Sequence, residues 1–347
     1  MKNIAAYLVD KRKLEFREIP IPKPKPNEVL VQIEYVGICG SDIHYYADRQ
    51  NGYRILTENH ILGHEPAGTV IEIGNDVKHL KVGDKVTIEP GVPCGKCEYC
   101  RSGNYNLCHQ VQFLGSAFPK VDGAFRNYIV HDAGFCYKLP KNVSTKQGAL
   151  IEPLGIGIEA TNVGKVKLGD TVAIFGAGCI GLVTALACKA RGASNIIVID
   201  VINNRLQKAL EIGANHVLNS KDVNVKNEIM KFTNQRGVDV VIDCAGFQES
   251  INTGVELIKR GGRIVMVGLG TLQPMTFDFV KFAANVGQML SIFRSKNAYP
   301  IAINALQNKQ IDLSKIITHE YDFKNLPEAF ETTINKKDEV TKIVIRM

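Results

Sequence analysis

Short apolar segments broken by Gly and Pro occupy the chain before residue 150. Runs at 29–35, 68–73, 85–88 and 125–130 are rich in β-branched and aromatic residues and are bounded by turn residues, which predicts strands. The proline-rich stretch 20–26 fits an extended surface segment, because proline fixes the backbone but cannot donate to a sheet. The pattern predicts an irregular, β-rich amino-terminal domain.

After residue 150 the rhythm changes to apolar strands at 171–175, 195–200, 238–243 and 263–267, which alternate with helical stretches. Such alternation predicts an α/β domain built on a parallel sheet. Beyond Phe293 the pattern is less regular, with a helix predicted over 300–307 and a closing strand over 341–346. From the pattern alone, this tail fits either domain.

Composition supports a folded protein with two domains. The 347 residues exceed the size at which one hydrophobic core usually stops growing. Hydrophobic residues make up 45% and charged residues 22%, the balance of an ordinary globular protein. The net charge of +7 is scattered along the chain without a basic run, which argues against a nucleic-acid partner.

The sequence also gives expectations about cellular context. The amino-terminal residues lack the apolar stretch of a signal peptide, and no segment approaches the roughly 20 apolar residues of a membrane span. We therefore expect a cytoplasmic protein with no membrane partner.

Four of the nine cysteines are crowded into one segment, with the spacing Cys-x2-Cys-x2-Cys-x7-Cys at Cys94, Cys97, Cys100 and Cys108. Four thiolates this close can converge on one tetrahedral zinc ion, although an iron–sulfur cluster uses similar spacings. A closed four-thiolate site has no position for substrate, so we expect this lobe to be structural. Metal ligation also fits a reducing compartment better than a disulfide framework does.

A glycine-rich turn at 176–181 follows the predicted strand 171–175 and opens a helix that runs to about Arg191. In this context the glycines permit a tight turn, close approach of a pyrophosphate and close helix packing. Asp200 ends the next predicted strand, where a carboxylate binds the adenosine ribose and repels a 2′-phosphate, so NAD is favoured over NADP. Arg205 is expected to flank the adenosine. The alternative is a glycine-rich turn of some other α/β protein.

Three further metal-ligand types stand outside the cysteine lobe, namely Cys39, His64 and Glu65. Singly, they have ordinary explanations as a small core residue, a satisfied polar group and a surface charge. Their joint presence instead suggests a second metal site, because all three side chains bind zinc.

Several longer runs carry a family resemblance. The run Gly63-His64-Glu65-x2-Gly68-x5-Gly74-x2-Val77, followed by the cysteine lobe and the glycine turn, resembles the zinc-containing medium-chain alcohol dehydrogenase family. Within it, the chain is most similar to sorbitol and xylitol dehydrogenases, through residues 37–46, 87–91 and 150–154. The resemblance covers essentially the whole chain.

The resemblance implies a fold of two parts. One is a Rossmann domain with a doubly wound parallel sheet, and the other is a GroES-like, β-rich catalytic domain. The expected boundaries are 1–152 for the catalytic domain with its zinc lobe at 94–108, 153–293 for the NAD-binding domain, and 294–347 for a return to the catalytic domain.

The resemblance also implies roles near the catalytic zinc. Its ligands would be Cys39, His64 and Glu65, and Glu152 would either bind zinc or hold its water, at the position where simpler alcohol dehydrogenases carry a second cysteine. Asp42 would orient His64. The catalytic residues are expected to be Ser41 and His44, as a proton relay, and Glu152.

For substrate, the resemblance points to Tyr45, Glu152 and Arg294 as partners of a polyhydroxy chain. Sorbitol dehydrogenases usually place a Tyr after the Arg, whereas this chain has Ser295, which alters one contact to the far hydroxyls. The expected cofactor contacts are Gly176, Gly178, Ile180, Gly181, Asp200, Arg205, Val267, Gly268, Leu269, Ile292, Phe293 and Arg294.

The sequence thus predicts an NAD-dependent zinc polyol dehydrogenase, similar to L-iditol 2-dehydrogenase, that converts a secondary alcohol into a ketose. The cofactors would be zinc and NAD, the partner a small polyol, and the assembly a homo-oligomer, either dimer or tetramer. The main alternative is a zinc dehydrogenase for 2,3-butanediol, threonine or a sugar-alcohol phosphate. A remote one is a catalytically silent nucleotide-binding protein. A nucleic-acid-binding zinc ribbon is disfavoured, because Glu98 and Tyr99 provide no phosphate-binding face.

Overall fold

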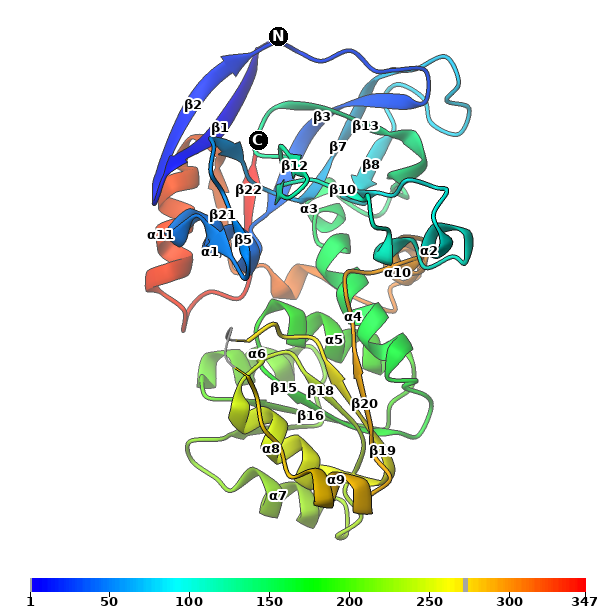
Figure 1. Ribbon diagram of the computed structural model, residues 1–347, viewed down its shortest axis with the longest axis vertical. Coiled ribbons are helices and arrows are strands. Elements are labelled where there is room, and N and C mark those ends of the chain that lie inside the picture. Colours follow the sequence, from blue (N-terminus) through cyan, green and yellow to red (C-terminus); the bar gives the residue numbers. More distant parts are fainter. Residues whose placement is uncertain (1, 271–273) are drawn as a thin grey trace. The chain divides into compact units, whose positions relative to one another are not determined.

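The chain folds into two units in the computed structural model, which describes residues 2–270 and 274–347 (Figure 1). The first unit comprises Met1–Glu152, Tyr299–Gln307 and Ile317–Met347, and the second comprises Pro153–Ala298 and Asn308–Ile316. This division differs from the expected boundary at residue 294, because residues 294–298 and 308–316 group with the second unit.

A seven-stranded sheet organises the first unit. In spatial order, six of its strands are β14 (Cys136–Lys138), β8 (Lys85–Ile88), β7 (Glu65–Ile73), β3 (Glu28–Gly37), β22 (Ile343–Arg346) and β21 (His319–Asp322). The seventh, β13 (Tyr128–Asp132), pairs with the first half of β3, and β22 pairs with its last residues. Because a strand has two edges, β13 and β22 share the edge of β3 that β7 leaves open. The predicted closing strand is β22, so the carboxyl end of the chain returns to the first unit.

Smaller elements surround this sheet. The additional strands are β1 (Asn3–Asp10), β2 (Lys13–Ile19), β4 (Gln50–Asn51), β5 (Arg54–Ile55), β6 (His60–Ile61), β9 (Gly91–Val92), β10 (Gln112–Phe113), β11 (Ser116–Ala117) and β12 (Lys120–Val121). The helices are α1 (Gly40–Asp48), α2 (Glu98–Arg101), η1 (Tyr105–Leu107), η2 (Ala133–Phe135), α3 (Thr145–Gly148), η4 (Phe323–Asn325) and α11 (Leu326–Asn335). Two longer helices, α4 (Ile151–Val163) and α10 (Ala298–Gln307), begin close to the boundaries between the units.

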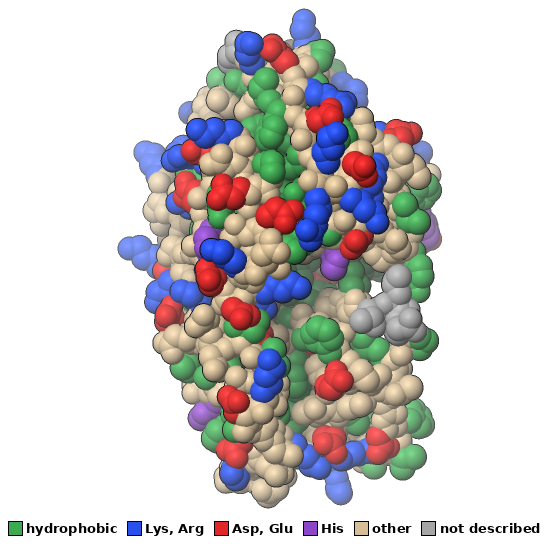
Figure 2. All heavy atoms as spheres, turned by 90° about the vertical axis from the view of Figure 1, so that its left-hand side faces the viewer, with side chains coloured by type: hydrophobic (Ala, Val, Ile, Leu, Met, Phe, Trp, Pro, Cys, Tyr) green, Lys and Arg blue, Asp and Glu red, His purple; other side chains and the backbone are tan. Residues whose placement is uncertain are grey.

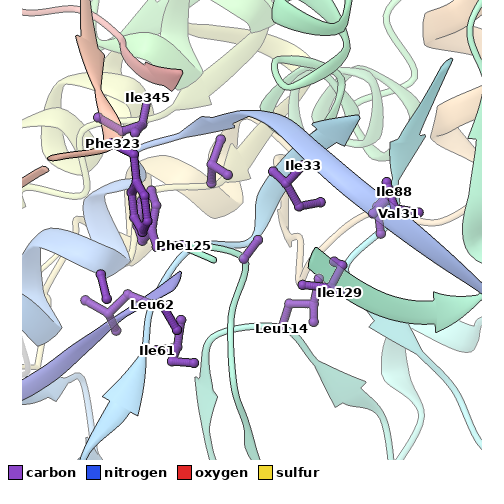
Figure 3. Packing of buried hydrophobic residues seen from close by; sticks show 14 of the residues in the cluster. Val31, Ile33, Ile61, Leu62, Ile88, Leu114, Phe125, Ile129, Phe323 and Ile345 are labelled. Atoms are coloured by element: carbon purple, nitrogen blue, oxygen red, sulfur yellow. The ribbon is translucent and has the colours of Figure 1, made fainter. Parts of the chain in front are cut away.

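The core of the first unit lies between its sheets and α11. Figure 3 shows Phe125 and Phe323 among side chains from several strands, including Ile33 and Ile129. Val29, Val31 and Ile33 of β3 are buried, whereas Gln32 between them is exposed, and Tyr128 and Ile129 of β13 are both buried. The core therefore joins segments from both ends of the chain.

The second unit contains a six-stranded parallel sheet with the order β17-β16-β15-β18-β19-β20. The strands are β15 (Thr171–Phe175), β16 (Asn195–Asp200), β17 (His216–Asn219), β18 (Val238–Asp243), β19 (Ile258–Met266) and β20 (Gln288–Ser291). The connecting helices are α5 (Cys179–Ala190), α6 (Asn203–Glu211), α7 (Val225–Phe232), α8 (Gln248–Leu257) and α9 (Phe279–Ala284), and η3 (Ser314–Ile316) follows later. Strand order reverses between β15 and β18, the arrangement of a doubly wound nucleotide-binding fold. The predicted fold class is confirmed.

Charges on the face that Figure 2 shows are mixed rather than segregated. Figure 2 shows Lys and Arg side chains interspersed with Asp and Glu over the face in view, without a large field of one sign. Within residues 2–270 and 274–347, no helix combines the length and apolar character that crossing a membrane requires.

One buried polar cluster stands out in the first unit, directly after β8. Glu89 is only 4% exposed, and its two carboxylate oxygens accept hydrogen bonds from the hydroxyls of Tyr105 and Tyr137, each at 2.9 Å. Its backbone oxygen lies 2.9 Å from His131 Nε2. Burial raises the pKa of Glu89 to about 7, although the two tyrosine hydroxyls act in the opposite direction.

The core assignment can be tested with two isoleucines of the first unit. Ile129 is fully buried, whereas Ile55 is 61% exposed. We expect Ile129→Ala to lower the free energy of unfolding by about 2–5 kcal/mol, because it removes buried methyl groups and leaves a cavity. Ile55→Ala should change it by less than about 0.5 kcal/mol. Urea titrations would measure both, and equal losses would contradict the assignment.

The pKa of Glu89 gives a pH-dependent prediction. Its value in the folded chain lies above the ordinary value of 4.5, so the stabilisation tied to protonation is complete below that value and lost as pH rises through about 7. Between about pH 5 and pH 8, the wild type should therefore lose up to about 3 kcal/mol of stability relative to Glu89→Gln.

Thermal melting at several pH values would measure this difference. The exposed Glu72 on β7 provides a matched control, because Glu72→Gln removes the same charge without removing a buried one. Identical pH dependence in wild type and Glu89→Gln would show that Glu89 does not titrate in this range.

Candidate metal centre and nucleotide-binding turn

Strand pairing brings the three predicted ligands of a catalytic metal together. The ligand atoms of Cys39, His64 and Glu65 all lie within 4.8 Å of one another. His64 and Glu65 stand at the start of β7, and Gly37 at the end of β3 pairs directly with Glu65, which places Cys39 just beyond it. Sulfur, nitrogen and oxygen donors at these separations fit a zinc ion.

Asp42 holds this arrangement from the first turn of α1. Its Oδ1 lies 3.4 Å from His64 Nδ1 and accepts the Gly63 N–H, while Oδ2 accepts the Cys39 N–H. Burial acts against the ionised carboxyl, yet His64 and the two backbone donors lower the pKa of Asp42 overall. Because His64 Nδ1 faces Asp42, Nε2 is left to face a metal. The position of Asp42 thus agrees with the expectation that it orients His64.

Lys342 is a part of the site that sequence reasoning missed. Its ammonium group, 3% exposed, forms an ion pair with Glu65 and donates a 2.9 Å hydrogen bond to the Ile38 carbonyl. Glycine at position 37 makes room for this pair, since a Cβ there would lie 1.9 Å from Glu65 Oε2. The available signal was a lone lysine at the start of the apolar strand β22, where a buried charge requires a partner.

Glu152 lies near the same centre, in the first turn of α4. It is not among the three closely grouped ligands, but it interacts electrostatically with His64 and Glu65. Burial raises the pKa of Glu152 to about 7, although the positive charge of His64 acts in the opposite direction. Metal binding by Glu65 and metal binding by Glu152 therefore both stay predictions.

Three of the predicted relay and substrate residues, Ser41, His44 and Tyr45, lie on α1. Ser41 stands three positions before His44 and four before Tyr45, so the three side chains share one region of the helix surface. His44 is exposed and can exchange protons with water, whereas Tyr45 is buried and burial raises its pKa. Arg294, the third predicted substrate residue, belongs to the second unit.

The four cysteines of the lobe form a second ligand group. Cys94, Cys97, Cys100 and Cys108 present their sulfur atoms within 4.8 Å of one another, and two sulfur pairs are 3.5 and 3.9 Å apart. Zinc–sulfur bonds of about 2.3 Å in a tetrahedron require about 3.8 Å between sulfurs. All four are free thiols, and backbone N–H groups point at Cys94 and Cys108. The lobe has the donor set of a structural zinc site.

The glycine turn has the geometry expected for a nucleotide site. Gly176 has a φ of +92°, and a Cβ at position 181 would lie 1.8 Å from the Gly176 carbonyl, so both positions require glycine. Among the described residues other than Gly178 and its two chain neighbours, no atom lies within 4 Å of where a Cβ of Gly178 would be. Helix α5 begins directly afterwards, with Ile180 in its first turn, and the amino end of a helix in this position favours a phosphate group.

Asp200 lies beside this turn at the end of β16. Its Oδ2 accepts the Ala177 N–H at 2.6 Å, and its Oδ1 accepts the N–H groups of Val201 and Ile202 at 2.7 and 3.0 Å. These bonds fix the carboxylate at the carboxyl edge of the sheet. Arg205 follows in α6 and is partly exposed.

The remaining predicted cofactor residues also follow strands of the parallel sheet. Val267, Gly268 and Leu269 come directly after β19, and residues 292–294 come directly after β20. The carboxyl ends of parallel strands share one edge, so these segments lie at the same edge as the glycine turn. The Arg294 guanidinium stacks over the Phe293 ring at 4.8 Å.

Known families match both parts of the chain. Residues 25–141 match the alcohol dehydrogenase GroES-like domain, and residues 179–308 match the zinc-binding dehydrogenase family. The chain is 38% identical to sorbitol dehydrogenase of Bacillus subtilis, over 98% of this chain and 96% of that protein. It is 42% identical to human sorbitol dehydrogenase, over 92% and 89% of the two chains.

A similar solved structure is described as a short chain alcohol dehydrogenase (rspB) from Escherichia coli CFT073 complexed with cofactor NADH. It superposes with a TM-score of 0.92 at 28% identity and covers 100% of this chain and 99% of that one. The resemblance noted in the sequence is thus confirmed. The chain belongs to the zinc-containing medium-chain alcohol dehydrogenases and is an oxidoreductase similar to the sorbitol dehydrogenases of that family.

Proposed function

We propose that this dehydrogenase oxidises a secondary alcohol of a polyol to a ketone, with zinc as its resident metal and NAD as hydride acceptor. The observation that carries the proposal is the close grouping of Cys39, His64 and Glu65, with His64 oriented by buried Asp42. The similarity to sorbitol dehydrogenases supports a polyol as substrate.

The donor set fits zinc, and Cys39 and His64 would hold it together with Glu65 or Glu152. When bound, zinc lowers the pKa of the substrate hydroxyl as a Lewis acid, and NAD accepts the hydride from the alcohol carbon. Asp42 keeps the His64 ring in one orientation, and Lys342 fixes the Glu65 carboxylate.

The hydroxyl proton leaves through residues of α1 in this proposal. Ser41 accepts it at its hydroxyl and passes it to His44, whose exposed ring releases it to water. Tyr45, Glu152 and Arg294 bind hydroxyl groups of the polyol. Serine has no phenol, so Ser295 does not supply the contact that a tyrosine usually makes at this position in sorbitol dehydrogenases.

Asp200 supports NAD rather than NADP. A ribose with two free hydroxyls can donate to its carboxylate, whereas a 2′-phosphate would meet a like charge at the same place. The three backbone bonds to Asp200 hold the carboxylate in position for this discrimination.

Turnover assays test the substrate assignment directly. Reduced nicotinamide should form with sorbitol, xylitol or another pentitol, and a zinc chelator should abolish the activity. Cys39→Ser should lower kcat/KM by at least about 100-fold, since losing even an outer partner of a metal ligand costs 10–100-fold.

One control variant and a panel of other substrates make these assays decisive. Cys136→Ser changes a cysteine of the same unit outside both metal-ligand groups and should leave turnover within a few-fold of wild type. Activity on 2,3-butanediol, threonine or a phosphorylated alcohol alone would overturn the polyol assignment. No activity with any of these substrates would favour the silent nucleotide-binding alternative.

The cofactor assignment has its own variant. Asp200→Asn removes the charge but keeps an oxygen acceptor, and it should raise the KM for NAD by about 10-fold or more, because a hydrogen bond to a charged group contributes about 1.5–3 kcal/mol. Asp222→Asn removes the same charge at an exposed position of the same unit and serves as control. An unchanged ratio of NAD to NADP efficiency in Asp200→Asn would show that Asp200 does not select the cofactor.

A further inference from the structure

The cysteine lobe is fastened to the main sheet of the first unit through Glu89. One oxygen of this buried carboxylate accepts a hydrogen bond from Tyr105, which lies in η1 between Cys100 and Cys108. The other accepts one from Tyr137 on β14. Glu89 therefore joins an element inside the lobe to a strand outside it.

The base of the lobe reaches the candidate metal ligands. Strands β9 and β10 enter and leave the lobe and pair with each other, with Phe113 opposite Gly91. The Phe113 ring lies 5.5 Å from the His64 ring, centroid to centroid. A shift of the lobe would therefore move the Phe113 ring against His64, a predicted zinc ligand.

A second connection runs from Tyr137 toward Glu152. The rings of Tyr137 and Tyr299 stack at 5.2 Å with an interplanar angle of 26°. Tyr299 is 1% exposed, donates a hydrogen bond to the Ile88 carbonyl, and lies near enough to Glu152 for the carboxylate charge to act on its phenol. Tyr137, which donates to Glu89, thus also packs on a tyrosine that lies within the electrostatic influence of Glu152.

Breaking the hydrogen bonds to Glu89 costs free energy, and this cost favours one position of the lobe relative to β14. Each phenol removed from Glu89 would leave a buried carboxylate oxygen without a donor, which is more costly than losing an exposed hydrogen bond. The two phenols come from separate elements, so the two hydrogen bonds tie the lobe to β14, beside the edge-on contact of the Tyr105 and Phe135 rings.

We propose that Glu89 is a positioning residue through which the four-cysteine lobe keeps the Cys39–His64 metal centre in its metal-holding geometry. The proposal rests on the proposed function, because it assumes that both ligand groups bind metal. It gives the lobe a role at the catalytic centre in addition to its own local folding.

Cobalt-loaded full-length protein tests the proposal without turnover. Co²⁺ bound by one thiolate and Co²⁺ bound by four thiolates differ in absorption, and Cys39→Ser identifies the lobe signal. In Tyr105→Phe, which removes only the hydroxyl, we expect Co²⁺ at the Cys39–His64 centre to be lost to a chelator about tenfold faster than in wild type. Tyr137→Phe should have the same effect.

The matched control is Tyr99→Phe. Tyr99 lies in the same lobe and packs its ring against His109 rather than toward Glu89, so its loss of a hydroxyl should leave the rate unchanged. An unchanged rate at the Cys39–His64 centre in both Tyr105→Phe and Tyr137→Phe would overturn the proposal, as would an effect confined to the lobe signal. An equal acceleration in Tyr99→Phe would overturn it as well.

Failure of the proposed function gives a different result. If wild type binds Co²⁺ at both centres and the variants behave as expected but no polyol is oxidised, only the substrate assignment fails. If wild type binds no metal at Cys39 and His64, both proposals fail.

Discussion

The antiparallel pairing of β3 with β7 is the contact on which the metal centre depends. It sets Gly37 opposite Glu65 and so brings Cys39, just past the end of β3, to the two residues at the start of β7. Strand β22 pairs with the last residues of β3 on the other edge, which delivers Lys342 to Glu65. A shift of register by one residue would turn these side chains to the opposite face of the sheet.

Two buried acids of this centre each lie beside a basic side chain. Asp42 faces His64 and Lys342 faces Glu65, and both acids are about 1% exposed. An isolated charge in such surroundings would be strongly unfavourable, so each partner offsets the desolvation cost of the other. A bound zinc ion would add positive charge beside Cys39 and the carboxylates, and its binding therefore fits the excess of acidic donors around it.

The second unit obeys a different constraint. Its parallel strands all end at one edge, so segments that are separate in the chain meet there, such as the glycine turn, Asp200 and the residues after β19 and β20. Glycine at 176 and 181 keeps the turn tight enough for α5 to begin beside β15.

The sequence by itself determined what local spacing decides. The four cysteines converge because short loops join them, the glycine turn follows from strand, turn and helix in direct succession, and alternation after residue 150 predicts the parallel sheet. Only the tertiary structure decided the ion pair of Lys342 with Glu65, the two tyrosines on Glu89, the ring contact of Phe113 with His64, and the grouping of residues 294–298 and 308–316 with the second unit. These contacts join residues far apart in the chain, and their partners depend on strand order and register, which a single sequence does not specify.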